Sequence, residues 1–194
     1  MKIIGTKLNF EREPFKAPFG FKGKYLYSLW QIVVELESKN GNTGLGVGVQ
    51  SVLWSDSNVF SQFSPEGGNA VMFLLTEYAL KHCADVEWEP PVELLDYLYP
   101  KVIEYGKKLT SDSMRDTFAL NALVPVDLAA WQLYAAEKDI TNFDDMIGEL
   151  YQPALSTKHE QLACIPLVNY SLSDEDILDL VKNGYFFFKI KVIK

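Results

Sequence analysis

The sequence contains few cysteines, few basic residues and no long apolar run. Its two cysteines, Cys83 and Cys164, have the spacing of neither a disulfide framework nor a zinc knuckle, and both stand among apolar neighbours. We therefore expect two buried free thiols. Basic residues number 18 against 26 acidic ones, so the net charge is −8. This balance disfavours binding to nucleic acids and to anionic membrane surfaces.

No stretch reaches the roughly 18 apolar residues of a membrane-spanning helix, and the N-terminus lacks the apolar core of a secretion signal. The expected compartment is therefore the cytoplasm, with no membrane partner. The chain has 194 residues, of which 48% are hydrophobic and 23% charged. This composition is typical of a globular protein with one large domain or two small ones.

The first fifty residues predict a three-stranded antiparallel meander. A weakly alternating strand covers residues 3–10. Residues 11–27 are predicted as a loop rich in aromatic residues and lysine, because prolines and glycines interrupt them. The β-branched run that follows predicts a strand ending at the hairpin turn Asn40-Gly41. Residues 43–54 form the return strand, whose glycines leave room for close backbone packing or a bulge.

A helical period replaces the strand pattern after a second irregular loop at 55–68. Asn69 can serve as the N-cap of the first helix, and Pro125 should bend or interrupt a later one. Thr141 or Asn142 caps a short helix. The expected helical ranges are 69–83, 91–109 as one or two helices, 114–139 and 141–148.

The last part of the chain predicts one βαβ unit. Apolar strands over 162–170 and 185–193 flank a compact helix over 173–184, with Ser173 as N-cap and Gly184 just past its end. Strands that are apolar throughout and joined by a helix are typical of a parallel sheet covered by helices.

The second of these strands carries Lys189 and Lys191 on one face, about 7 Å apart along the strand. Two interpretations remain open. The lysines protect a sheet edge against aggregation, or the strand belongs to a β/α barrel, where catalytic groups stand at the C-terminal ends of strands. In the second case a partly desolvated lysine beside another cation gives up its proton more readily and acts as a base.

Three segments together resemble the enolase superfamily, in its mandelate racemase/muconate lactonizing enzyme branch. Residues 2–21 are similar to the family's first strand and specificity loop. Residues 122–139 resemble a family helix, in which Asp127, Ala130 and Trp131 fit an Ala-Leu-Asp-x-Ala-x-Trp-Asp pattern. "NGYFFFKIKV" is similar to the second barrel strand of the subgroup with a Lys-x-Lys motif. The likeness is greatest to L-Ala-D/L-Glu (dipeptide) epimerases.

In that family a capping domain closes a (β/α)₇β barrel, and the enzymes remove the proton α to a carboxylate while Mg²⁺ holds the enediolate. The resemblance implies that Lys191 is the base on one face of the substrate and that Lys189 stabilises negative charge. It places the Mg²⁺ ligands on later strands, beyond Lys194, so no metal ligand is expected in this chain. The implied substrate is a small-molecule carboxylate or dipeptide.

The resemblance also implies a substrate-binding role for aromatic and basic residues of the two loops. Because the family's first loop covers the active site, the candidates are Phe19, Phe21, Lys22 and Tyr25, with Trp54 on the second loop. From the residues alone, packing within the meander explains the aromatic side chains equally well.

The expected architecture is an α+β capping domain, made of a three-stranded antiparallel meander and a helical bundle, followed by the first βαβ unit of an incomplete (β/α) barrel. The domains are a capping domain at 1–135, a connecting segment at 136–160 and the start of the barrel at 161–194. A barrel alone needs about 250 residues. We therefore expect the N-terminal part of a Mg²⁺-dependent racemase or epimerase, inactive alone and prone to self-association through open sheet edges. The alternative is a non-catalytic α+β domain with structural or anion-binding lysines.

Overall fold

The structure is a computed structural model that describes residues 1–21, 24–169 and 172–191. Within these ranges no helix combines the length and apolar character needed to cross a bilayer. In chain order the elements are β1 (Ile3–Phe21), β2 (Lys24–Ser38), β3 (Thr43–Gln50), α1 (Val52–Ser55), α2 (Ser57–Cys83), α3 (Pro91–Leu109), α4 (Asp116–Glu137), α5 (Phe143–Met146), α6 (Gln152–Leu155), β4 (Leu167–Val168), α7 (Asp174–Lys182) and β5 (Lys189–Ile190).

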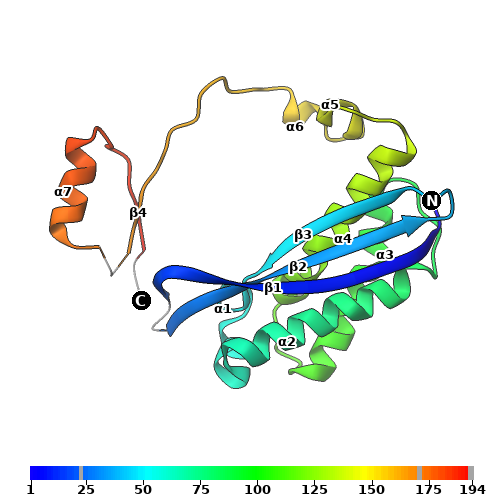
Figure 1. The fold of residues 1–194 in the computed structure, drawn as a ribbon, viewed down its shortest axis with the longest axis horizontal. Helices are drawn as coiled ribbons and strands as arrows, with labels where there is room; N and C mark the ends of the chain where they lie inside the picture. The colour runs from blue at the N-terminus through cyan, green and yellow to red at the C-terminus, as the bar shows by residue number, and fades with distance from the viewer. Residues whose placement is uncertain (22–23, 170–171, 192–194) are drawn as a thin grey trace. The chain divides into compact units, whose positions relative to one another are not determined.

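The chain divides into two compact units. The first comprises residues 1–14 and 28–146, and the second comprises 15–27 and 147–194. The first unit contains a three-stranded sheet in the order β1-β2-β3, with helices α2 to α4 on one of its faces (Figure 1). The antiparallel meander and helices predicted from the sequence are therefore confirmed.

The prediction of a loop at 11–27 is wrong. β1 continues to Phe21 and β2 already begins at Lys24, so the two strands form a long hairpin. Pro14 and Pro18 are compatible with this strand because β1 is the outer strand of the sheet, and one side of its backbone has no strand to bond. Near the base of the hairpin, Phe10 stacks on Trp30 with ring centroids 4.2 Å apart.

The second hairpin forms as predicted. Gly41 has φ +86°, and its N–H donates to the Ser38 carbonyl at 3.0 Å. Such a positive φ suits glycine, which has no Cβ to clash. β3 then packs on α4 through Gly44, Gly46 and Gly48: a Cβ on Gly46 would lie 2.0 Å from the Pro125 carbonyl oxygen. The glycines therefore serve close backbone packing, one of the two roles predicted.

The prediction of a second loop at 55–68 is also wrong. Its residues form α1 and the first half of α2, and the helix kinks at Ser64 with φ 63° and ψ 169°. After the kink, the Ser64 hydroxyl accepts from the Gly67 N–H at 3.3 Å. Asn69 is therefore not an N-cap. It lies one turn inside the helix, where its amide donates to the Pro65 carbonyl at 2.8 Å.

Two buried polar side chains tie the helices together. Asp56 caps α2 by accepting from the Asn58 and Val59 N–H groups, and its other oxygen accepts from the Arg115 N–H at 2.8 Å. Thr76 on α2 donates to the Ala122 carbonyl of α4 at 2.8 Å. Both α3 and α4 continue through an internal proline, so Pro125 does not divide its helix.

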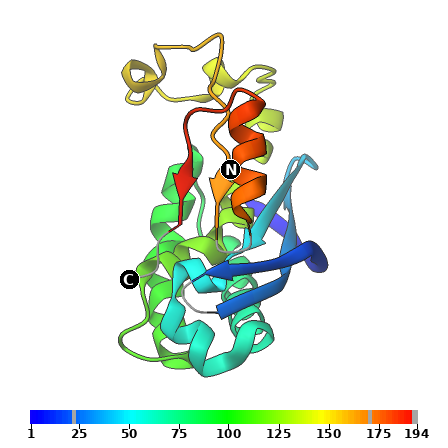
Figure 2. The ribbon, with the colours of Figure 1, turned by 90° about the vertical axis from the view of Figure 1, so that its left-hand side faces the viewer.

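The parallel strand pair in the second unit confirms the predicted βαβ order. β4 pairs with β5 in parallel, and α7 connects them (Figure 2). Ser173 caps α7 in a capping box with Asp176, and Gly184 beyond its end has φ +90°. Each strand has two residues, far fewer than predicted.

One cysteine prediction fails. Cys83 is a buried free thiol, and burial raises its pKa to about 12. Cys164 is free but exposed, because it lies in an extended stretch before β4 that is not packed against a core.

Candidate functional site

The candidate catalytic lysines flank Ile190 on the short parallel ladder of the second unit. The Lys189 N–H donates to the Pro166 carbonyl and the Lys191 N–H to the Val168 carbonyl, both at 3.0 Å. Because side chains alternate along a strand, this spacing puts both ammonium groups on one face. The ladder fixes the register of β5, in which Lys189 lies opposite Leu167.

The two lysines differ in their surroundings. Lys191 is half-buried, whereas Lys189 is exposed. On the opposite face, where covering helices were expected, Phe186 is 80% and Ile190 66% exposed. The βαβ unit thus presents the lysines on the predicted strand, and its apolar face is only partly covered: Phe188 is half-buried, whereas Phe186 and Ile190 are exposed.

The predicted substrate-binding residues of the first loop lie around the tip of the long hairpin. Residues 15–27 belong to the same compact unit as β4, α7 and β5. Phe19 is half-buried, with its ring 6.4 Å from that of Phe15, while Tyr25 is 61% exposed. Phe21 ends β1, and Lys22 lies outside the described residues.

Trp54 does not join this group. It lies on α1 in the first unit, 42% exposed, so the predicted second loop that was to carry it does not exist. Its neighbour Ser55 is buried, and the Ser55 hydroxyl donates to the Asn121 side chain at 3.1 Å.

The described part of the chain contains no cluster of side chains suited to binding a metal ion. Within residues 1–21, 24–169 and 172–191, no three Asp, Glu, His or Cys side chains gather as metal ligands. The Mg²⁺ implied by the resemblance therefore does not fit the residues described.

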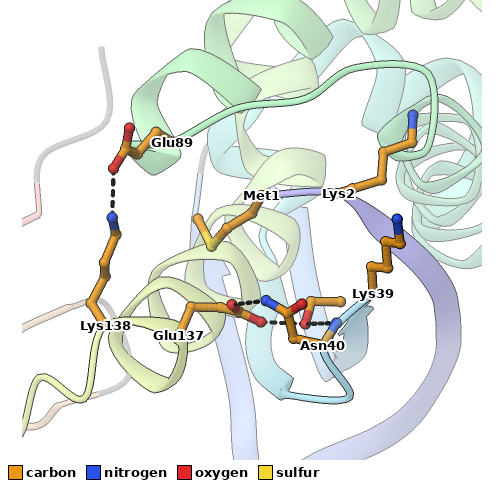
Figure 3. A pocket seen from close by; sticks show the side chains of 8 residues that line it. Met1, Lys2, Lys39, Asn40, Glu89, Glu137 and Lys138 are labelled. Carbon is orange, nitrogen blue, oxygen red and sulfur yellow. Dashed lines mark hydrogen bonds and ion pairs between the residues drawn. The ribbon is translucent and has the colours of Figure 1, made fainter.

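The sequence did not point to a polar cavity of about 330 Å³ at the other end of the first unit's sheet (Figure 3). Glu137, at the end of α4, accepts there from the Ser38 hydroxyl and from the Asn40 and Asn42 amides, and these bonds lower the pKa of its carboxyl. The Asn40-Gly41 turn was the available signal. Since these groups bond one another, we assign them a structural role.

The helix residues that resemble the family pattern lie beside the seam between α3 and α4. Asp127 is half-buried, and burial raises the pKa of its carboxyl, opposed by a hydrogen bond from Trp131. Ala130 is fully buried. This arrangement accounts for the pattern by packing: a small residue faces the neighbouring helix, and a carboxylate orients the indole.

Comparison with models of protein families found no match, and comparison with curated proteins found none either. Solved structures do match. The L-talarate/galactarate dehydratase of Salmonella typhimurium LT2 is 18% identical, with a TM-score of 0.58 over 98% of this chain and 44% of the dehydratase. The L-Ala-D/L-Glu epimerase of Bacillus subtilis, in a substrate-liganded complex, is 18% identical, with a TM-score of 0.54 over 99% of this chain and 45% of the epimerase.

A mandelate racemase/muconate lactonizing protein from Herpetosiphon aurantiacus is 13% identical, with a TM-score of 0.55 over 97% of this chain and 44% of that protein. The chain thus spans less than half the length of each of these three proteins. Likeness at this level of identity is a likeness of fold. The chain therefore shares its fold with part of each of these three proteins, as the resemblance of its sequence led us to expect.

Proposed function

We propose that the chain is part of an isomerase that removes the proton α to a carboxylate, with a dipeptide as substrate. The observation that carries this proposal is the Lys-x-Lys pair on a parallel strand of a fold shared with such enzymes. Structures of related fold include dipeptide epimerases complexed with Mg and a dipeptide. Dehydratases share the fold too, so the fold alone does not select the reaction.

Lys191 is the proposed base and Lys189 its cationic partner. A neutral Lys191 amine would take the α-proton, and the electron pair left on carbon would delocalise into the substrate carboxylate. The Lys189 ammonium would then stabilise the negative charge that develops there. The greater shielding of Lys191 supports this division, because a base works best where water does not compete for its lone pair.

The hairpin tip is the proposed cover of the substrate. Phe19 and Tyr25 supply aromatic surface within the compact unit that contains the lysine strand, which supports a contact with the substrate's side chains. Phe21 and Lys22 remain candidates by their position in the sequence. Trp54 remains a weaker one, because it stands on a helix of the first unit.

The described residues supply no site for Mg²⁺, so none of these steps is assigned to a metal. The neighbours' chains are about twice as long, and the chemistry of a whole barrel would draw on residues that this chain lacks. We therefore propose that the 194-residue chain alone does not turn over substrate.

Solvent exchange of the α-proton tests this assignment. In D₂O with Mg²⁺, NMR would follow the α-proton of L-Ala-L-Glu and L-Ala-D-Glu for the chain alone and for any longer gene product containing it. We expect exchange only in the longer protein. Lys191→Ala should abolish exchange of one epimer, and Lys189→Ala should slow both. Undiminished exchange of both epimers in Lys191→Ala would remove Lys191 from the mechanism.

One observation favours a non-catalytic alternative. Lys189 is exposed on β5, which fits a strand-protecting or anion-binding lysine as well as a catalytic one. In that case Lys189→Ala should increase aggregation without affecting any turnover. A coding region that stops after Lys194, without a frameshift, would favour this alternative.

A further inference from the structure

The tip of the β1–β2 hairpin has two unlike faces. A Cβ on Gly20 would lie 3.3 Å from the Tyr25 ring, so these two residues are cross-strand neighbours on one face. Because side chains alternate along each strand, Phe19, Lys24 and Leu26 lie on the opposite face. The hairpin tip therefore places an aromatic ring and an ammonium group on the same side.

The face with Phe19 is the covered one. Leu26 is 5% exposed and Phe19 is half-buried, whereas Tyr25 on the other face is 61% exposed. Lys24 begins β2 and is exposed, so its ammonium group stands where the covered face meets solvent. Of the aromatic candidates Phe19 and Tyr25, Phe19 is thus the one that shares a face with Lys24.

The hairpin tip is cationic although the whole chain is acidic. The sequence between Glu13 and Glu35 contains three lysines and no acidic residue, whereas the net charge of the chain is −8. Farther down the hairpin Lys7 pairs with Glu35 at 2.7 Å, but Lys24 has no ion-pair partner among the described residues. A lysine without a carboxylate, at the rim of an apolar face, is suited to bind an anionic group on an apolar stem.

We propose that Lys24 binds a carboxylate in the side chain of the substrate, while Phe19 packs against the methylene groups of that side chain. This subsite rests on the proposed function and narrows the substrate to dipeptides whose second residue is acidic. The reacting carboxylate is assigned to Lys189, on a strand of the same compact unit, so the second carboxylate needs a cation of its own. Lys24 would select the substrate and take no part in proton transfer.

Exchange of the α-proton tests the subsite, measured by NMR in D₂O with Mg²⁺ on the full-length gene product that contains this chain. The probes are L-Ala-L-Glu and its neutral isostere L-Ala-L-Gln. We expect kcat/KM to be at least about tenfold higher for L-Ala-L-Glu. Lys24→Met should remove this preference by slowing L-Ala-L-Glu alone, and Lys24→Arg should retain it. Added salt should reduce the preference, because Lys24 is exposed.

Lys16→Met is the matched control. The rings of Phe15 and Phe19 lie 6.4 Å apart, which indicates that both residues face the same way, so the exposed Lys16 beside Phe15 lies on the opposite face from Lys24. Its loss should change the preference by less than about twofold. Circular dichroism would verify that each variant is folded.

Three results would overturn the subsite and leave the proposed function standing. They are equal kcat/KM values for the two dipeptides, a preference that survives Lys24→Met, and a preference lost equally in Lys16→Met. Exchange of neither dipeptide would overturn the proposed function, and the subsite with it.

Discussion

The first unit and residues 147–191 use the same local signals and reach different degrees of burial. In the first unit β3 lies directly on α4, and large side chains such as Phe118, Met72 and Leu133 are fully buried. Among the described residues of 147–191 none is buried, although α7 has a complete capping box and apolar residues at helical spacing. Caps and spacing therefore define a helix locally, whereas a core requires a second layer.

The parallel strands show why the second layer is missing. Parallel sheets are normally covered on both faces, but in residues 147–191 the one helix beside β4 and β5 that the structure describes is α7, and its Leu178 and Val181 are 57% and 51% exposed. The helix, the turn after it and the strand register form without a core. Matched residues in the two regions should therefore differ in reactivity and in their effect on stability.

The two cysteines give the largest expected difference, because one lies in each region. Cys164 is exposed, whereas Cys83 is buried and its thiol has a pKa raised to about 12. A thiol reagent such as DTNB should modify Cys164 at once and Cys83 at least about a thousandfold more slowly, since modification of Cys83 needs unfolding. Absorbance of the released thiolate measures both rates, with Cys83→Ala and Cys164→Ala to assign them. Equal rates would mean that the first unit's core opens freely.

Two glycines provide the second comparison. A Cβ on Gly46 would lie 2.0 Å from the Pro125 oxygen and 2.5 Å from the Ala129 nitrogen, backbone atoms that cannot turn aside. Gly46→Ala should therefore lower the free energy of unfolding by about 2–4 kcal/mol. At Gly148 nothing lies within 4 Å, so Gly148→Ala should change it by less than about 0.5 kcal/mol.

Urea unfolding followed by tryptophan fluorescence measures this difference, because all four tryptophans lie in the first unit. Gly184→Ala would add a strained case, since its φ of +90° disfavours alanine without any steric neighbour, and amide exchange in α7 rather than fluorescence would detect its effect. If Gly46→Ala proved as mild as Gly148→Ala, the close approach of β3 to α4 would not be a source of stability.

The sequence was most informative where the structure depends on neighbouring residues. The Asn40-Gly41 turn, the glycines of β3 and the Ser173 cap each follow from backbone chemistry within a few positions, and each was predicted. Both wrong loops came from treating proline and glycine as breaks. Pro18 is tolerated because β1 is an outer strand. Pro65 is tolerated because Ser64, the residue before it, has a non-helical conformation that kinks α2, and the helix continues after it. Neither circumstance is visible in local sequence.

The candidate site divides in the same way. Alternation along β5 predicts that Lys189 and Lys191 share a face, because a strand has a fixed period. How far each amine is shielded from water, and whether Phe186 meets a covering helix, depends on distant residues, so the pattern of the strand alone does not give either.

Two carboxylates give the smallest and most selective comparison. Hydrogen bonds from Ser38, Asn40 and Asn42 lower the pKa of Glu137, and those from the Ser173 N–H and hydroxyl lower the pKa of Asp176 in α7. A lowered pKa in the folded state means that the ionised carboxylate stabilises the fold above its unfolded pKa, and that this contribution disappears as pH falls through the folded pKa. Both effects should therefore be complete at neutral pH and lost in acid, below the ordinary value of about 4.

Glu137→Gln should lower the melting temperature of the first unit by about 2–4 °C at pH 7, and wild type and variant should converge as pH falls below about 4. Asp176→Asn should also be destabilising at pH 7, but the helix that it affects, α7, lies outside any core. It should reduce the amide protection of α7 and leave the main transition unchanged. Calorimetry and hydrogen exchange separate the two readouts, and a shift of the main transition by Asp176→Asn would show that α7 folds together with the first unit.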